Sequence, residues 1–369
     1  MSIATGTGIR HILEKAYAGE RLTFEDGLAL MKSPDLLEIA AAADHVRRRF
    51  HPDDTVTFII DRNINYTNIC AAQCSFCAFK RDPGHPEGYV LSWEELDRKC
   101  QELVDQGGTQ VLLQGGLNPD LKLEYYQELI HRIQSKFPQL TVHGFSPAEI
   151  WFLARISRMT LRECIQALRD AGLRSIPGGG GEILVDRVRR RIGKGKVLTD
   201  QWFEVMEVAQ ELGLNTTATM MYGHVETVEE QVETLVRIRN SQDRYGGYMA
   251  FIHWDFQPGG TRLGLEMEAE GGYHLGTGWD YLRIMAVARL ILDNIPNIQV
   301  SWVTQGPKLA QVALRFGAND FGGTMMEENV VSAAGTIHHV NPDDAVRLIR
   351  DAGFHPAQRD TFYNVIRRF

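Results

Sequence analysis

The first fifty residues carry apolar positions at helical spacing. This spacing predicts three helices over residues 9–18, 23–31 and 35–50. The second helix opens on Thr23 with Asp26 three residues later, a spacing that favours a capped helix start. We therefore expect an N-terminal helical extension over residues 1–50.

From residue 51 onward, short apolar and β-branched runs alternate with amphipathic helical stretches. The predicted strands are 56–60, 110–114, 141–145, 174–176, 215–221, 248–256, 298–304 and 320–325. The predicted helices are 92–106, 122–137, 147–171, 199–212, 227–244, 277–294 and 307–316, with a final helix near 342–352. Eight strand and helix units in series predict an α/β fold, a (β/α)8 TIM-type barrel over residues 51–369, rather than a doubly wound sheet.

Composition and charge narrow the class of protein. The 369 residues are 44% hydrophobic and 23% charged, as in globular proteins. The net charge of −8 and the absence of a long basic block argue against nucleic acid as a partner. Residues 1–18 show no secretory signal pattern, and the most apolar window, 284–292, is far shorter than the ~20 residues of a membrane helix. We expect a cytoplasmic protein without a membrane span.

Glycine and proline gather directly after several predicted strands. The segments are 114–116, 175–182, 256–260 and 321–324. In a barrel these lie at the C-terminal face, where active sites are built. We therefore expect the functional site at this face.

Three of the five cysteines form a close triplet. Cys70, Cys74 and Cys77 follow a C-x3-C-x2-C spacing in the loop after the first barrel strand, whereas Cys100 and Cys164 lie in helices and are expected to be buried. An odd, small number of cysteines argues against a disulfide framework. Three close thiolates can hold zinc or an iron–sulfur cluster. Zinc in a structural site takes a fourth ligand, and the nearest candidate, His85, lacks the usual spacing.

The triplet, with Phe76 directly before its last cysteine, resembles the signature of the radical S-adenosylmethionine (SAM) enzymes. Further stretches resemble the dehypoxanthinyl futalosine cyclases of the futalosine route to menaquinone. These stretches are 61–70, 76–79, 83–92, 113–118, 143–147, 175–186, 218–226, 293–308 and 357–361. Sister enzymes, the aminofutalosine synthases and a subunit of the deazaflavin chromophore (FO) synthase, share several of them. A non-catalytic structural zinc protein is the alternative from a different class.

The resemblance implies a 4Fe-4S cluster held by Cys70, Cys74 and Cys77, with SAM on the iron that no cysteine binds. One electron then cleaves SAM to methionine and a 5′-deoxyadenosyl radical. In the cyclases this radical takes hydrogen from C4′ of the substrate ribose, and the new carbon radical adds to the benzoate ring. The implied partners are the small-molecule substrate and a one-electron donor such as a flavodoxin or ferredoxin.

The same resemblance indicates the cofactor contacts. It places Phe76 on the adenine, with shielding of the cluster as the alternative role. It places Gln114, Gly115 and Gly116 at the methionine moiety, where a tight turn is the alternative; Leu117 stands where the family pattern often has an acidic residue. Glu182 is expected to bind ribose hydroxyls or the amino group of SAM, unless it serves a helix N-terminus.

Polar and aromatic residues at the other predicted strand ends are candidates for cofactor or substrate contacts. Each histidine among them has a structural, hydrogen-bonded role as its alternative. No residue in the sequence is identified as the base for the final deprotonation. The candidates are His143 and Ser146 at the third strand, Tyr222 and His224 at the fifth, and Trp254, Gln257 and Thr304.

Overall fold

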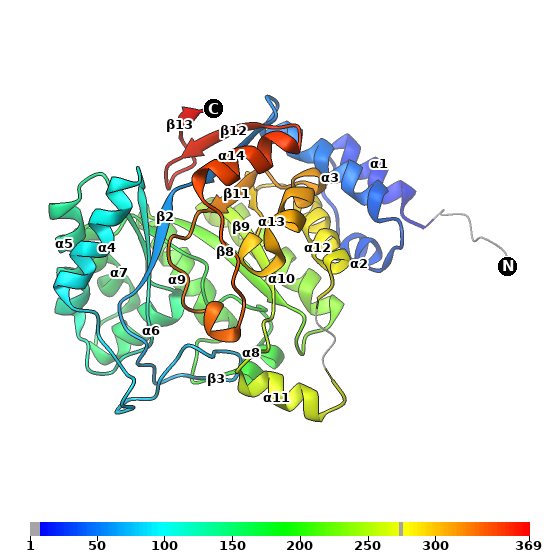
Figure 1. Ribbon diagram of the computed structural model, residues 1–369. Helices are drawn as coiled ribbons and strands as arrows, with labels where there is room; N and C mark the ends of the chain where they lie inside the picture. Colours follow the sequence, from blue (N-terminus) through cyan, green and yellow to red (C-terminus); the bar gives the residue numbers. More distant parts are fainter. Residues whose placement is uncertain (1–7, 273–275) are drawn as a thin grey trace.

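A computed structural model describes residues 8–272 and 276–369, and it shows a curled parallel sheet with helices on its outer face (Figure 1). Residues 1–7 of the predicted extension lie outside the described part. The sheet strands are β1 (Thr55–Ile59), β2 (Asp61–Asn65), β4 (Gln110–Gln114), β5 (Thr141–Gly144), β6 (Ser175–Ile176), β8 (Asn215–Tyr222), β9 (Tyr248–Asp255), β10 (Asn297–Gln299) and β11 (Asp320–Gly323), joined by β12 (His355–Arg359) and β13 (Val365–Arg368).

One continuous stretch of chain brings the two ends of the curled sheet together. The strand order runs β13-β12-β1-β11-β10-β9-β8-β6-β5-β4-β2, and only Ile60 separates β1 from β2. β1 pairs in parallel with β11, and β2 pairs in parallel with β4. Counting β1 and β2 as one strand, eight parallel strands form a ring. The predicted (β/α)8 TIM-type barrel is confirmed.

Most barrel helices lie where the sequence predicts helix, whereas those at 186–192 and 262–269 were not predicted. The barrel helices are α4 (Trp93–Asp105), α5 (Leu123–Lys136), α6 (Pro147–Ile156), α7 (Leu161–Asp170), α8 (Asp186–Ile192), α9 (Thr199–Glu211), α10 (Val228–Tyr245), α11 (Arg262–Ala269), α12 (Gly278–Ile291), α13 (Trp302–Ala313) and α14 (Pro342–Asp351). Many begin at a Ser or Thr whose hydroxyl accepts a backbone N–H. At Thr227 and Thr277 the acidic residue three positions later completes a capping box.

The N-terminal extension consists of α1 (Arg10–Ala18), α2 (Phe24–Lys32) and α3 (Leu36–Phe50), as predicted. The capping box at Thr23 is present. α2 and α3 pack against α12, and α2 also packs against α10. Leu30, Ile39 and Ala43 are fully buried there, so the extension shares one hydrophobic core with the barrel.

The predicted single helix over 147–171 is wrong, because the structure has two helices there. α6 ends at Ile156 and α7 begins at Leu161. Arg158 between them has a positive φ of 56°. Thr160 and Glu163 form a capping box that starts α7, so a second helix start interrupts an otherwise helical pattern.

The predicted strand over 298–304 is also too long. β10 ends at Gln299, and α13 begins at Trp302. The indole N–H of Trp302 donates to the carbonyl of Gly323 at 2.9 Å. This tertiary hydrogen bond outweighs the strand preference of the β-branched and aromatic residues there. Thr304 therefore lies in the first turn of a helix.

The C-terminal helix is not the last element. After α14 the chain forms a β12–β13 hairpin, and β12 pairs in parallel with residues 55–58 of β1. In Figure 1 this hairpin lies at the top, opposite α8, α11 and the small β3 (Gln73–Cys74). The hairpin is fixed by a buried ion pair. Arg359 donates from Nε and Nη2 to the Asp320 carboxylate at 2.6 and 3.0 Å.

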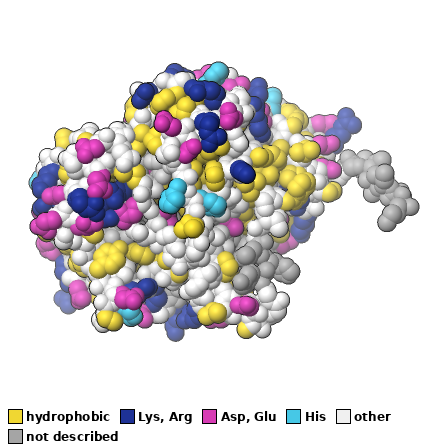
Figure 2. Space-filling model, viewed as in Figure 1, with side chains coloured by type: hydrophobic (Ala, Val, Ile, Leu, Met, Phe, Trp, Pro, Cys, Tyr) yellow, Lys and Arg dark blue, Asp and Glu magenta, His cyan; other side chains and the backbone are white. Residues whose placement is uncertain are grey.

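The face of the molecule seen in Figure 2 carries side chains of both charges. Figure 2 shows basic and acidic side chains interspersed, with no large basic region on this face. Within residues 8–272 and 276–369, no helix is both long and apolar enough to cross a bilayer.

We predict that Arg359→Met destabilises the fold strongly, because it leaves the buried Asp320 carboxylate without its cation. Breaking such a pair costs about 3–5 kcal/mol of unfolding free energy. Urea unfolding measures the effect. The double variant Arg359→Met with Asp320→Asn should recover part of the loss, and the exposed Arg98→Met serves as a control expected to change little. Equal losses in the single and double variants would contradict the assignment.

Candidate active site

A cavity of about 420 Å³ opens among the C-terminal ends of the barrel strands. Nearly all predicted site residues line it, although they come from distant parts of the sequence. They are Cys70, Cys74, Phe76, Cys77, Gln114, Gly115, Gly116, His143, Ser146, Glu182, Trp254, Gln257 and Thr304.

Tyr222 and His224 are not among the residues that line the cavity. The Tyr222 side chain is buried, and its hydroxyl has no hydrogen-bond partner among the described residues. Both ring nitrogens of His224 form hydrogen bonds with nearby backbone groups. Its Nε2 lies 3.0 Å from the carbonyl oxygen of Met221, and its Nδ1 accepts the N–H of Val225. The structure therefore gives these two residues no place in the cavity wall.

The cysteine loop is held by backbone hydrogen bonds on three sides. The N–H of Cys70 donates to Arg81, and that of Ala71 donates to Leu117. β3, which contains Cys74, pairs antiparallel with β7 (Gly193–Lys194). These backbone hydrogen bonds fix the shape of the loop.

The three thiols of the cysteine loop are available as metal ligands. All three are free, half-buried and line the cavity. Among the described residues, no three His, Cys, Asp or Glu side chains converge on a point where one metal ion would bind. Zinc holds its sulfur ligands at about 2.3 Å around one atom, whereas a cluster distributes its cysteines over separate irons.

The cavity wall also influences thiol ionisation. Burial raises the pKa of Cys70 and raises that of Cys74 to about 12, while the ammonium of Lys196 acts in the opposite direction on both. These thiols are therefore protonated at neutral pH, and metal binding must release their protons.

Two glycines let the segment after β4 approach the cysteine loop. A Cβ at Gly116 would lie 2.2 Å from the carbonyl oxygen of Ile69 and 2.9 Å from Cβ of Cys70. A Cβ at Gly115 would lie 2.6 Å from the ring of Tyr66. Only glycine fits at these positions, so the segment has a packing role beyond a tight turn.

A buried carboxylate that the sequence analysis missed holds this segment. Glu149 Oε1 accepts the hydroxyl of Tyr66 at 2.6 Å and the N–H of Gly115 at 2.9 Å. Its Oε2 accepts the N–H and the hydroxyl of Ser146 at 2.7 and 2.6 Å. Burial raises the pKa of Glu149, and these hydrogen bonds oppose that rise. The predicted contact residue Ser146 is thus the N-cap of α6. Its spacing to Glu149 is a capping-box signal that was available in the sequence.

Glu182 and Lys196 form a buried pair beside the cysteine loop. The ammonium of Lys196 donates to Glu182 Oε1 at 2.7 Å and lies 5.0 Å from the ring centroid of Phe76. Glu182 has a positive φ of 35°, a strained conformation for a side-chain-bearing residue. Because α8 begins only at Asp186, a helix N-terminal role does not account for Glu182. No sequence motif pointed to Lys196.

His143 at the end of β5 is a neutral, hydrogen-bonded residue. Its Nδ1 lies 2.8 Å from the hydroxyl of Ser175. Complete burial lowers the pKa of His143 to about 3. The imidazole is therefore uncharged at neutral pH and cannot act there as a cation for a carboxylate.

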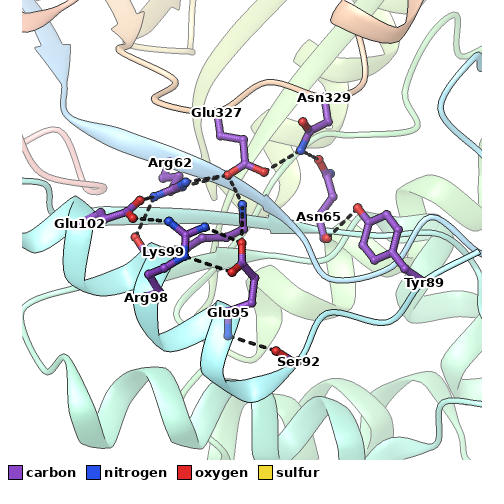
Figure 3. A network of polar contacts seen from close by, with 10 residues as sticks. All are labelled: Arg62, Asn65, Tyr89, Ser92, Glu95, Arg98, Lys99, Glu102, Glu327 and Asn329. Atoms are coloured by element: carbon purple, nitrogen blue, oxygen red, sulfur yellow. Dashed lines mark hydrogen bonds and ion pairs between the residues drawn. The ribbon is translucent and has the colours of Figure 1, made fainter.

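A polar network anchors the loop after β11 to the barrel (Figure 3). Glu327 accepts from Arg62 at 2.9 Å and from Lys99, and Arg62 also donates to Glu102 of α4 at 2.6 Å. Asn329 donates to Asn65 at 3.2 Å. Because the following residues 330, 331 and 334 line the cavity, the network fixes one part of its wall.

Two family models match successive parts of the chain. Residues 64–238 match the radical SAM superfamily, and residues 245–368 match the CofH/MqnC C-terminal region. The first match contains the end of β2, the cysteine loop and the strands from β3 to β8. The second contains β9, the loop after β11 and the C-terminal hairpin.

Curated relatives align along almost the whole chain. The cyclic dehypoxanthine futalosine synthase of Halalkalibacterium halodurans is 47% identical, with 97% of this chain and 95% of the relative covered. That of Streptomyces coelicolor is 43% identical, covering 96% and 88%. The aminodeoxyfutalosine synthase of Thermus thermophilus is 40% identical, covering 96% and 95%.

Solved structures show the same fold at low identity. The hydrogenase maturase HydG superposes with a TM-score of 0.74 at 16% identity, covering 98% of this chain and 77% of that one. Methylornithine synthase (PylB) superposes with a TM-score of 0.72 at 21% identity, covering 94% and 97%.

We predict that Gly116→Ala prevents normal cluster assembly, because its methyl group would displace the backbone next to Cys70. Anaerobic reconstitution followed by iron and sulfide analysis should show a severalfold lower content than wild type. Gly8→Ala is the control, since a Cβ at Gly8 meets nothing within 4 Å. A full cluster content in Gly116→Ala would contradict this account of the close approach.

We predict that Glu149→Gln lowers the unfolding free energy by about 2–3 kcal/mol, because an amide cannot accept all four hydrogen bonds. Glu163→Gln is a matched control: Glu163 caps α7 in the same way but is exposed. Urea unfolding of both variants should show a clearly smaller loss for Glu163→Gln. Equal losses would mean that Glu149 is an ordinary capping residue.

Proposed function

This chain belongs to the radical SAM superfamily and to its CofH/MqnC family, and on that basis we propose that it cyclises dehypoxanthinyl futalosine to cyclic dehypoxanthinyl futalosine in menaquinone synthesis. The observation that carries the proposal is the near full-length similarity to two cyclic dehypoxanthine futalosine synthases, at 47% and 43% identity. The sister aminodeoxyfutalosine synthase is 40% identical, so the synthase reaction remains the second candidate.

The proposed reaction requires a cluster, SAM and a substrate held in one enclosed space. When bound, the cluster and SAM supply a 5′-deoxyadenosyl radical for hydrogen abstraction. Cys70, Cys74 and Cys77 would hold three irons, which leaves the fourth for SAM. The protein then mainly positions the reactive groups and excludes water.

This chain's own residues would position SAM in the following way. The Gln114–Gly116 segment, fixed by Glu149, would lie along the methionine moiety, because glycine allows close backbone approach. Phe76 would pack on the adenine at the cavity wall. The Glu182–Lys196 pair offers one carboxylate and one ammonium beside the cysteine loop for the polar groups of SAM.

The electron must come from outside the chain, and we assign it to a flavodoxin or ferredoxin. Gln73, next to Cys74, is exposed, so the cysteine loop lies close to the protein surface. A donor can therefore reach the cluster without entering the cavity. The five free cysteines suit a reducing compartment, and we propose the cytoplasm.

The test is an anaerobic assay with reconstituted protein, SAM, dithionite and dehypoxanthinyl futalosine. We expect 5′-deoxyadenosine that depends on the substrate, together with a product two hydrogens lighter, both measured by mass spectrometry. Cys74→Ala is the control and should lose the cluster and all turnover. Formation of 5′-deoxyadenosine with unchanged substrate would reject the cyclase and redirect the test to the sister reaction.

A further inference from the structure

The strand that closes the barrel carries three polar side chains into the cavity. Asp61, Asn63 and Asn65 occupy alternate positions of β2, and all three line the cavity. The residues between them, Arg62 and Ile64, do not line it. This is the alternation of a strand with one face turned inward. On the neighbouring β4, Gln110 and Gln114 also line the cavity.

Two of these three side chains have hydrogen-bond partners within the protein. Asp61 accepts the N–H of Met325 at 2.9 Å and the amide of Gln110 at 3.3 Å. Asn65 donates to the carbonyl oxygen of Gln114 at 3.2 Å and accepts from Asn329 at 3.2 Å. The protein has thus fixed the orientation of both.

Asn63 differs from its two neighbours. It is 6% exposed, and its Oδ1 has no hydrogen-bond partner in the described part of the chain. Buried amide groups are almost always paired, and an unpaired one destabilises the fold. Because Asn63 lines the cavity, a ligand bound there can supply the missing partner.

The opposite side of the cavity, at β8 and β9, has more apolar lining residues than the side at β2 and β4. In the ring of eight strands, β8 and β9 lie four positions away from β2 and β4, which places them across the barrel. Their cavity-lining residues include Met221, Ile252 and Trp254. The cavity therefore has a mainly polar wall at β2 and β4 and a mixed wall at β8 and β9, where these three residues form an apolar, partly aromatic patch beside the polar Thr217, Thr219 and Asp255.

We propose that Asn63 hydrogen-bonds a ribose hydroxyl of the substrate, so that the sugar lies along β2 and the aromatic ring faces β8 and β9. This assignment rests on the proposed function and adds a specificity residue to it. The amide can donate and accept, which matches a hydroxyl group. A site built to bind a hydroxyl discriminates against the analogue that lacks it, because its own polar group is then left unpaired.

The test measures substrate affinity with reconstituted protein and SAM but without reductant, so that no turnover occurs. Calorimetry compares dehypoxanthinyl futalosine with analogues that each lack one ribose hydroxyl. Wild-type protein should bind one analogue about tenfold more weakly. Asn63→Ala should bind the full substrate about tenfold more weakly and should lose the discrimination against that same analogue.

Asn294→Ala is the matched control, since its Oδ1 is also buried and unpartnered but lies outside the cavity wall. It should keep the wild-type affinity ratios. Thermal unfolding adds a second readout. Asn63→Leu should unfold at the wild-type temperature or above, because it removes an unpaired buried amide, whereas a structural hydrogen-bonding residue would lose stability.

Two results would overturn the assignment, and they are distinguishable. Wild-type protein that discriminates between the analogues, with Asn63→Ala discriminating equally, would reject the role of Asn63 alone. Wild-type protein that binds neither the substrate nor the analogues would reject the proposed function together with this assignment.

Discussion

The structure depends on the shared strand formed by β1 and β2. Its first half pairs with β11 and β12, and its second half pairs with β4, so one stretch of chain closes the barrel. The cysteine loop follows this strand directly. Its inward positions present Asn63 to the cavity, while Arg62 joins the network that anchors Glu327. Barrel closure, cluster loop and cavity wall are therefore set by a single element.

Around that strand, the buried charges are compensated inside the protein. Asp320 is paired with Arg359, Glu182 with Lys196, and Glu149 with four hydrogen-bond donors. Buried charges are costly unless they are paired or hydrogen-bonded. Their arrangement gives a rigid cavity, which suits a reaction that needs reactive atoms held close together. Asn63 differs from these groups, because its buried amide oxygen has no hydrogen-bond partner among the described residues.

Much of the fold was predictable because barrel strands and helices follow local periodicity. The strands over 110–114 and 141–145 could be predicted from short apolar runs that lie between turn residues. The break at Thr160 was missed although its capping box was present in the sequence, because continuous apolar spacing on both sides outweighed it. The strand predicted through Thr304 failed for a different reason. The indole of Trp302 bonds to Gly323, a partner that no local pattern reveals.

By itself the sequence determined what depends on near neighbours in the chain. The spacing of Cys70, Cys74 and Cys77 indicated a cluster loop, and the glycines after the strands indicated the face of the barrel that carries the site. Only the tertiary structure decided which groups meet there. Lys196 beside Phe76, Glu149 beneath Gly115 and the unpaired amide of Asn63 all depend on contacts between distant segments. Whether a buried group is paired is a property of the assembled barrel, since its partners come from other strands and helices.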